Sequence, residues 1–112
     1  MCLFCDLAGV EAVKVMENEG AYALFDKFPK AKGHSLVIPK AHSANFFEMD
    51  VADLPFVHDL VVKMKDKLLA EDSSIKGFNI WSNVNEVSGQ SILHTHVHLI
   101  PRRENDGLKV LS

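Results

Sequence analysis

The run His94-Thr95-His96-Val97-His98-Leu99-Ile100-Pro101 places three of the six histidines of the chain at strict alternation in an apolar, β-branched stretch. Alternate residues of a strand point to one face and rise about 3.3 Å each, so a strand over 94–101 would align three imidazoles. Thr95, Val97 and Leu99 would face a core, and Pro101 would end the strand. The alternatives are a solvent-exposed strand that happens to carry histidine and an adventitious metal tract, but a solvated face normally mixes Lys, Glu and Thr. We therefore expect a functional site on this strand.

The rest of the chain predicts four more strands and two helices. Strand-like runs cover 13–17, 21–25, 35–39 and 78–83, with turn signals between them. Over 53–71 the apolar residues follow helical spacing, and 43–48 predicts a short helix. His58 lies on the long helix and is interpreted as an exposed polar residue. The fold class is α+β: a five-stranded antiparallel sheet with one long and one short helix on one face.

Length and charge limit the function further. A chain of 112 residues fits one domain, which we place at 1–102, with a tail at 103–112. The formal charge of -3 and the absence of a Lys/Arg block longer than Arg102-Arg103 argue against a nucleic-acid partner. The first residues lack a basic flank and soon meet Glu11 and Lys14, so we expect no signal peptide, no membrane span and a cytoplasmic location.

Two further segments accompany the histidine run. Gly89-Gln90-Ser91 leads into it, and His34 stands before the apolar run that ends at Pro39. On these residues the chain resembles the histidine triad family, whose motif is His-φ-His-φ-His-φ-φ with φ apolar. Thr95 departs from the strict motif, but threonine is a good strand residue. The resemblance covers residues 2–102 and implies the family fold, in a homodimer whose subunits share a sheet.

The resemblance also implies the catalytic groups. His96, the central histidine, would attack the α-phosphorus of a nucleotide and form a nucleotidyl-histidine that water hydrolyses. His98 and Ser91 would contact the phosphate and the leaving group, and His34 would complete the histidine network. Such chemistry needs a neutral imidazole whose second nitrogen is held by a hydrogen bond. Histidine at the third position of the motif, rather than the glutamine of the transferase branch, implies a hydrolase.

The substrate contacts follow from the same resemblance. Asp26 matches a carboxylate that accepts hydrogen bonds from ribose hydroxyls, although outside the motif it would be interpreted as a turn residue. Asn83 matches a position near the phosphate and sugar, and the backbone at Gly89 and Gln90 would offer amides to an anion. Four apolar residues match the base pocket, although each taken singly is more often core: Phe4, Leu7, Leu24 and Phe25.

Cys2-x-x-Cys5 forms a second constellation. Two cysteines at this spacing can clamp one tetrahedral zinc ion. Some histidine triad proteins carry such a metal, held also by a histidine after the third strand and by the first histidine of the triad, which here are His42 and His94. The resemblance therefore implies a structural zinc site. A redox Cys-x-x-Cys, which normally opens a helix after a strand, and two unligated thiols are the alternatives.

Two functions of different classes remain open. The leading hypothesis is a hydrolase of nucleoside 5′-phosphoramidates or related conjugates, with dinucleoside polyphosphate hydrolysis as the other branch. Asn83 and Ser91 stand where the polyphosphate branch tends to carry Gln and Thr, which favours the phosphoramidates. The rival is a purine-nucleotide-binding scaffold without catalysis, and the intact His96 favours the enzyme.

Overall fold

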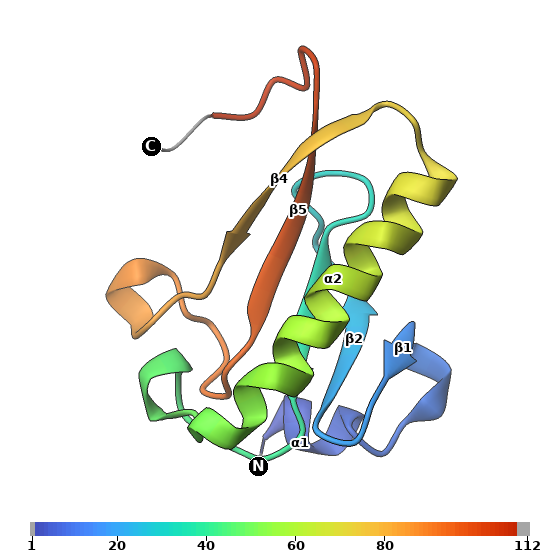
Figure 1. Ribbon diagram of the computed structural model, residues 1–112. Helices are drawn as coiled ribbons and strands as arrows, with labels where there is room; N and C mark the ends of the chain where they lie inside the picture. Colours follow the sequence, from blue (N-terminus) through green and yellow to red (C-terminus); the bar gives the residue numbers. More distant parts are fainter. Residues whose placement is uncertain (1, 110–112) are drawn as a thin grey trace.

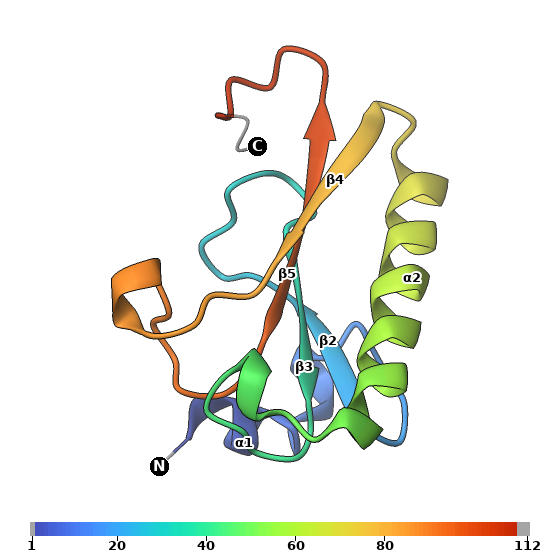
Figure 2. The same cartoon turned by 60° about the vertical axis from the view of Figure 1, so that its left-hand side comes forward.

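The computed structural model describes residues 2–109 and contains one antiparallel sheet with the strand order β1-β2-β3-β5-β4. The strands are β1 (Met16–Glu17), β2 (Ala21–Phe25), β3 (Ser35–Pro39), β4 (Ile75–Trp81) and β5 (Val97–Arg103). The long helix α2 (Leu54–Glu71) covers one face of the sheet, and the short helix α1 (Leu3–Leu7) lies near one end of it (Figures 1 and 2). The expected α+β class with a five-stranded antiparallel sheet is confirmed.

Strand alternation divides the apolar residues into two cores. On the α2 side, Val97 and Leu99 of β5 pack with Val57, Leu60 and Met64 of the helix. On the opposite side, a smaller cluster contains Phe4, Tyr22, Leu24, Leu36 and Ile38. His98 is paired with Leu36 and alternates with Val97 and Leu99, so it faces the side away from α2. The candidate site therefore lies on the sheet face that the long helix leaves free.

The strand over the histidine run differs from expectation. β5 begins at Val97, so only His98 of the three histidines lies within it, and the expected strand over 94–101 is wrong at its start. The N–H of Thr95 donates to the carbonyl of Ser43 at 2.8 Å, which takes this part of the backbone out of the ladder. β5 also continues through Pro101 to Arg103. Because β3 pairs with β5 only as far as Leu99, the missing N–H of Pro101 falls where β5 has β4 as its neighbour.

Other boundaries shift as well. β1 is only two residues long, and β4 starts earlier and ends sooner than the expected 78–83. The expected helix over 43–48 is a single 3₁₀ turn, Phe46–Glu48, capped by the side chain of Asn45. β5 passes the expected domain boundary by one residue. Beyond it, Asp106 accepts from the Arg102 guanidinium at 2.8 and 3.0 Å, which ties the expected tail to the strand.

Two smaller expectations concern the long helix and membranes. α2 agrees closely with the predicted 53–71, and His58 is exposed on it as expected. Within residues 2–109, no helix combines the length and the apolar character needed to cross a membrane.

Candidate functional site

The structure brings the four expected metal ligands together from three segments of the chain. His94 Nδ1 lies 3.2 Å from Cys2 Sγ, 3.5 Å from Cys5 Sγ and 3.2 Å from His42 Nδ1. Cys5 Sγ and His42 Nδ1 are 3.4 Å apart. All four donor atoms lie within 4.8 Å of one another. We call this group the thiol cluster.

The buried imidazole of His94 has a fixed tautomer. Its Nε2 lies 2.7 Å from the carbonyl oxygen of Pro39, and because a carbonyl only accepts, Nε2 carries the proton. Nδ1 of the neutral ring therefore presents a lone pair to the thiols. Burial lowers the pKa of His94, which favours the neutral form that binds a metal.

A second group gathers Asp26, His34 and His98, and we call it the relay cluster. The backbone N–H of Lys30 donates to His34 Nδ1 at 3.0 Å, so the ring proton of His34 is on Nε2. His34 Nε2 donates to His98 Nδ1 at 2.9 Å, and Asp26 Oδ2 lies 3.4 Å from the same Nε2. The proton of neutral His98 must then be on Nε2. The hydrogen bonds of this cluster thus run in one direction, from the backbone to His98.

The last group in this series of hydrogen bonds, Nε2 of His98, has no partner within the described part of the protein. His98 Nε2 is buried and makes no hydrogen bond there. Burial, with smaller contributions from His96 and His34, lowers the pKa of His98 to about 4. A buried N–H without an acceptor is costly, and such groups are often kept for a ligand. His98 therefore offers one neutral donor to whatever binds on this face.

His96 lies between the two clusters and has the opposite tautomer. Its Nδ1 is 2.8 Å from the backbone carbonyl oxygen of His94, so Nδ1 carries the proton and Nε2 holds the lone pair. Its ring centroid lies 5.1 Å from that of His98. In its neutral form His96 therefore has a lone pair on Nε2, on a ring adjacent to that of His98.

Two aromatic rings enclose these imidazoles. Phe4 meets His96 edge-on with the ring centroids 5.0 Å apart, and Trp81 lies 6.0 Å from His98. The contact between Trp81 and His98 was not predicted from the sequence, although the two residues lie directly opposite each other in the β4–β5 pairing. The sequence predicted a strand that contains Trp81, but the register that brings it to His98 depends on where β4 ends.

The loop before the histidine run is organised by Gln90. The side chain of this buried residue donates to the carbonyls of Ala44 and Ile92 and accepts from the N–H of Asn85. Its amide is thus committed to protein groups, whereas a substrate contact was expected for this residue. The backbone N–H groups of Gly89 and Gln90, which were expected to bind an anion, donate to the carbonyls of Glu86 and Asn85 at 2.9 and 3.2 Å. Their contact with an anion remains a prediction, and it would compete with these two bonds.

The other expected loop contacts differ in their surroundings. Gly89 has a positive φ of 105°, and a Cβ there would come within 3.4 Å of the Asn83 amide nitrogen, so these two residues lie together. Ser91 is exposed beside Cys2, Cys5 and His42, at the mouth of the thiol cluster. Among residues 2–109, no hydrogen bond joins Ser91 to a histidine. Its expected role at the leaving group therefore stays a prediction.

The expected nucleoside-binding residues also lie in different surroundings. Asp26 Oδ1 accepts from the N–H of Phe28, as in a turn, while its other oxygen approaches His34. Phe4, Leu7 and Leu24 belong to the core cluster on the histidine side of the sheet. Phe25 is exposed. Their contacts with a nucleotide remain predictions.

Comparison with known proteins gives a consistent result. The family model described as the HIT domain matches residues 8–105. An uncharacterized HIT-like protein of Mycoplasma genitalium is 38% identical over 92% of this chain and 74% of its own length. The yeast (Saccharomyces cerevisiae) protein named adenosine 5′-monophosphoramidase HNT1 is 35% identical over 97% of this chain and 68% of its own. A crystal structure of a HIT family protein from Bacillus anthracis superposes with a TM-score of 0.87, at 36% identity, and covers 99% of this chain and 80% of that one.

Proposed function

This chain belongs to the HIT domain family, and from that membership and the geometry of its histidines we propose that it hydrolyses nucleoside 5′-phosphoramidates or related nucleotide conjugates. The observation that carries the proposal is the opposite tautomers of two adjacent imidazoles. His96 offers a lone pair on Nε2, and His98 offers a proton on Nε2. A nucleophile next to a hydrogen-bond donor for the phosphoryl oxygens is an arrangement that suits displacement at phosphorus.

The reaction has two steps. His96 Nε2 attacks the α-phosphorus, the bond from phosphorus to the leaving nitrogen breaks, and a nucleotidyl-histidine forms. The leaving amine takes up a proton from solvent, while His98 keeps its proton and hydrogen-bonds through Nε2–H to a phosphoryl oxygen, where negative charge increases. Water then attacks the same phosphorus, the bond to His96 breaks, a proton returns to solvent, and the nucleoside monophosphate is released. A neutral His98 suits this role, and burial, which lowers its pKa to about 4, keeps it in that form.

The relay cluster keeps the proton of His98 on the correct nitrogen. Without a donor at Nδ1, a neutral histidine can exchange between its two tautomers, and half of the productive arrangement is lost. His34 removes this freedom by donating to Nδ1, and the Lys30 N–H in turn fixes His34. Asp26 adds a negative charge beside His34 Nε2, which favours a proton on that nitrogen. The cluster thus orients the donor and has no need to accept charge itself.

We also propose that the thiol cluster holds a structural zinc ion. Ligands about 2.0–2.3 Å from a tetrahedral centre stand roughly 3.3–3.8 Å apart, and the donor atoms here are separated by 3.2–3.5 Å where hydrogen-bond distances join them. His94 Nδ1 carries the lone pair that a metal needs, and its N–H to Pro39 supplies the outer support typical of ligating histidines. Zinc bound by two thiolates and two imidazoles has no open position, so its contribution is to fix the chain.

A substrate panel tests the hydrolase proposal. We expect adenosine 5′-phosphoramidates to be cleaved with a kcat/KM at least about tenfold above that for diadenosine triphosphate, which corresponds to about 1.4 kcal/mol in the transition state. Rapid quench at basic pH followed by mass spectrometry should show a nucleotidyl group on the peptide that contains His96. A higher kcat/KM with diadenosine triphosphate would instead assign the protein to the dinucleoside polyphosphate branch. Binding of AMP without turnover of any substrate would instead favour the scaffold function.

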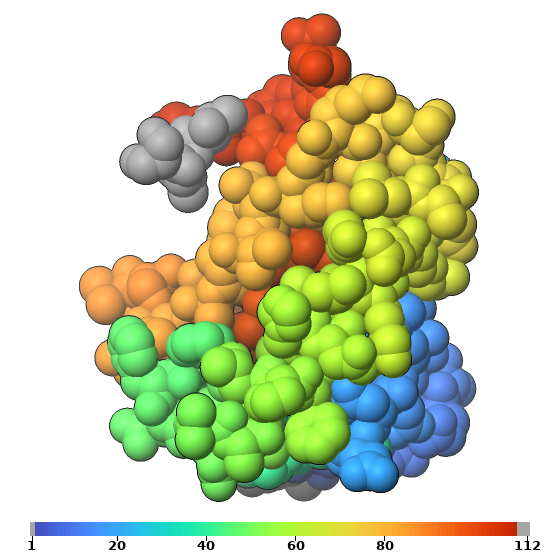
Figure 3. All heavy atoms as spheres, in the orientation of Figure 1, coloured from blue at the N-terminus to red at the C-terminus, as the bar shows by residue number. Residues whose placement is uncertain are grey.

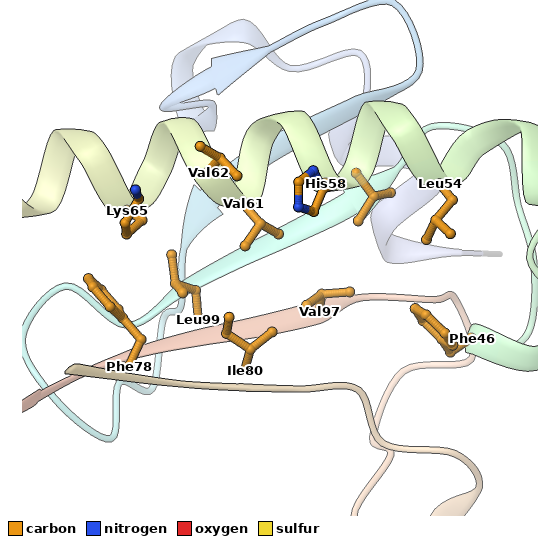
Figure 4. Close-up of a pocket in the computed structure, with 11 residues that line it drawn as sticks. Phe46, Leu54, His58, Val61, Val62, Lys65, Phe78, Ile80, Val97 and Leu99 are labelled. Carbon is orange, nitrogen blue, oxygen red and sulfur yellow. The ribbon is translucent and has the colours of Figure 1, made fainter.

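We propose further that the protein acts as a homodimer. β4 is an edge strand of the sheet, and an exposed edge can pair with a second copy. Beside it, an apolar groove of about 360 Å³ runs between α2 and the β4–β5 pair (Figures 3 and 4). Ile80 and Leu54 remain 58% and 40% exposed in this groove. A second copy that pairs along β4 would cover both the edge and the groove.

Sedimentation at micromolar concentration tests the dimer. A species of twice the 12.5 kDa chain mass is expected for the wild type. Ile80→Lys places a charge in the groove and should shift the equilibrium to the monomer. Lys76→Ala, at an exposed position of the same strand, is the matched control. A wild-type protein that sediments only as a 12.5 kDa species would refute the proposal.

A further inference from the structure

Helix α1, together with its N-cap residue Cys2, carries both thiols of the thiol cluster and the buried aromatic ring of Phe4. We infer that Phe4 is a positioning residue that couples the thiol cluster to the nucleophile His96. The inference rests on the proposed function, in which His96 attacks phosphorus and the thiol cluster binds zinc. It assigns to Phe4 a role that burial in a core alone would not require.

The imidazole of His96 is buried and contacts the ring of His98, but it makes a single hydrogen bond to the described part of the chain. That bond runs from Nδ1 to a backbone carbonyl two residues earlier, and by itself it does not fix the tilt of the ring about the N–H···O direction. Phe4 supplies a further constraint, since its ring meets His96 at an interplanar angle of 68° with the centroids 5.0 Å apart. An edge-to-face contact of this kind has a preferred geometry. The direction of the His96 lone pair therefore depends on where Phe4 is held.

Phe4 touches the thiol cluster as well. Its ring lies 5.9 Å from that of His94 at an interplanar angle of 89°, and Cys2 and Cys5 flank it in the sequence. The carbonyl that binds His96 belongs to His94 itself. His96 is thus held from two sides, by a ring and by a carbonyl, and both belong to residues of the thiol cluster or its helix.

The position of Phe4 depends on a helix that is too short to be stable alone. α1 has five residues, and its N-terminus is capped by the Cys2 thiol, which accepts from the Cys5 N–H at 3.3 Å. The Tyr22 hydroxyl donates to the Phe4 carbonyl, which anchors the backbone from the sheet side. Gathering the four ligands would fix the rest of the helix. A change at the thiol cluster would therefore reach His96 through Phe4.

Coupling between two sites is reciprocal, and this supplies a test that does not need turnover. If zinc fixes Phe4 against His96, a nucleotide that contacts His96 must change the affinity for zinc by the same factor as zinc changes the affinity for the nucleotide. The probe is AMP, and the readout is zinc affinity measured by competition with a chromophoric chelator. We expect saturating AMP to tighten zinc binding by the wild type by about fivefold to tenfold, at the lower end of the usual range of coupling.

Two variants in the same helix locate the coupling. Phe4→Leu keeps an apolar side chain but removes the edge-to-face contact, and we expect the effect of AMP on zinc affinity to fall below about twofold. Its kcat for an adenosine phosphoramidate should fall about tenfold, with KM changed by less than about threefold. Leu3→Ala, at an exposed position of α1 that also adjoins Cys2, is the matched control and should keep the full coupling.

The outcomes separate the inference from the proposed function. Zinc binding by the wild type that AMP does not alter would overturn the inference while leaving both the metal site and the hydrolase intact. Coupling that persists in Phe4→Leu would show that the His94 carbonyl alone transmits it, and would equally overturn the role of Phe4. A wild-type chain that binds no zinc would overturn the metal site together with this inference. If Phe4→Leu does not fold, Phe4→Met, another apolar change that removes the aromatic ring, makes the same comparison.

Discussion

The two ends of the histidine motif meet different chemical surroundings. Nδ1 of His94 faces two thiols and a second imidazole, whereas Nδ1 of His98 receives the N–H of His34. The other nitrogen of His94 is bound to a carbonyl, while that of His98 is buried without a partner among the described residues. In each ring one nitrogen is therefore hydrogen-bonded to the protein. The other nitrogen of His94, Nδ1, has a lone pair that suits a metal, and the other nitrogen of His98, Nε2, has a proton that suits an acceptor on a substrate.

The difference shows that the partner of one ring nitrogen decides what the other nitrogen can do. A carbonyl at Nε2 leaves His94 with a lone pair on Nδ1. A carbonyl at Nδ1 leaves His96 with a lone pair on Nε2, and a donor at Nδ1 leaves His98 with its proton on Nε2. The three side chains are chemically identical, and the different roles that we propose for them follow from these partners, two of which lie 55 and 64 residues away in the sequence. The following experiments test this assignment.

His96→Ala should have the largest effect, because it removes the nucleophile itself. We expect kcat for an adenosine phosphoramidate to fall by about 10³-fold or more, while the affinity for AMP stays within about tenfold. Steady-state kinetics and calorimetric titration with AMP measure the two quantities. Lys63→Ala, which changes an exposed residue of α2 outside the groove, is the control. Residual activity above about 3% of the wild type would contradict the assignment of His96.

Removal of the metal should have the next largest effect, on stability. Elemental analysis of untagged protein should find about one zinc per chain, and a chelator should lower the Tm by at least about 5 °C. Cys5→Ser removes one ligand, so its Tm should already be lower than that of the wild type. The chelator should lower the Tm of this variant by little more. A protein that keeps its Tm after complete removal of zinc would show that the thiol cluster is held together by its own contacts.

His34→Ala tests the relay cluster. The variant leaves His98 Nδ1 without a donor, so we expect kcat to fall about 10-fold to 100-fold with little change in KM. His34→Gln retains an N–H that can donate to Nδ1 and should restore part of the rate. Equal rates in the two variants would mean that His34 fills space without orienting His98.

The smallest effect is a pH dependence of stability. Burial lowers the pKa of His98 from its ordinary value of about 6.5 to about 4 in the folded protein, so the unfolded chain binds this proton more readily. The free energy of unfolding therefore includes the whole contribution of neutral His98 above about pH 6.5. This contribution is lost progressively as the pH falls toward 4. Between pH 7 and pH 5.5 the loss attributable to His98 should be about 1 kcal/mol.

Urea unfolding at the two pH values measures this loss. His98→Gln provides the comparison, because it removes the titrating group while the carboxylates remain. The free energy of unfolding of the variant should change less between pH 7 and pH 5.5 than that of the wild type. Equal changes in both proteins would mean that His98 is protonated as easily in the folded chain as in the unfolded one.

Local pattern was sufficient for much of the fold. The apolar runs of β2 and β3 and the helical spacing of α2 were predicted to within one residue, because burial on one face imposes those periods. The alternation over 94–101 predicted a strand by the same rule, and there it was wrong for His94 to His96. Those side chains are held by Pro39, Ser43 and the thiol cluster, and a local pattern carries no information about such distant partners.

The composition of the candidate site was easier to predict than its geometry. The motif identified the histidines and cysteines, and the structure brings the four expected ligands together. The helix α1 was missed because it depends on a thiol cap and on packing in the core. The contact of Trp81 with His98 and the committed amide of Gln90 depend on register and on loop closure. These are properties of the whole fold, and a single sequence shows them only after the strands are paired.

The two clusters also bear on how the chain reaches its native state. The contact between His34 and His98 joins residues 64 apart in sequence, and that between Cys2 and His94 joins residues 92 apart. During synthesis neither contact can form until the histidine run has left the ribosome, so both clusters are completed late and at about the same time. Long-range contacts of this kind slow folding, because the chain loses the entropy of loop closure before the contacts stabilise it. In the proposed metal site, a zinc ion that binds before the histidine run is synthesised would have Cys2, Cys5 and His42 as ligands. His94 would complete its coordination later.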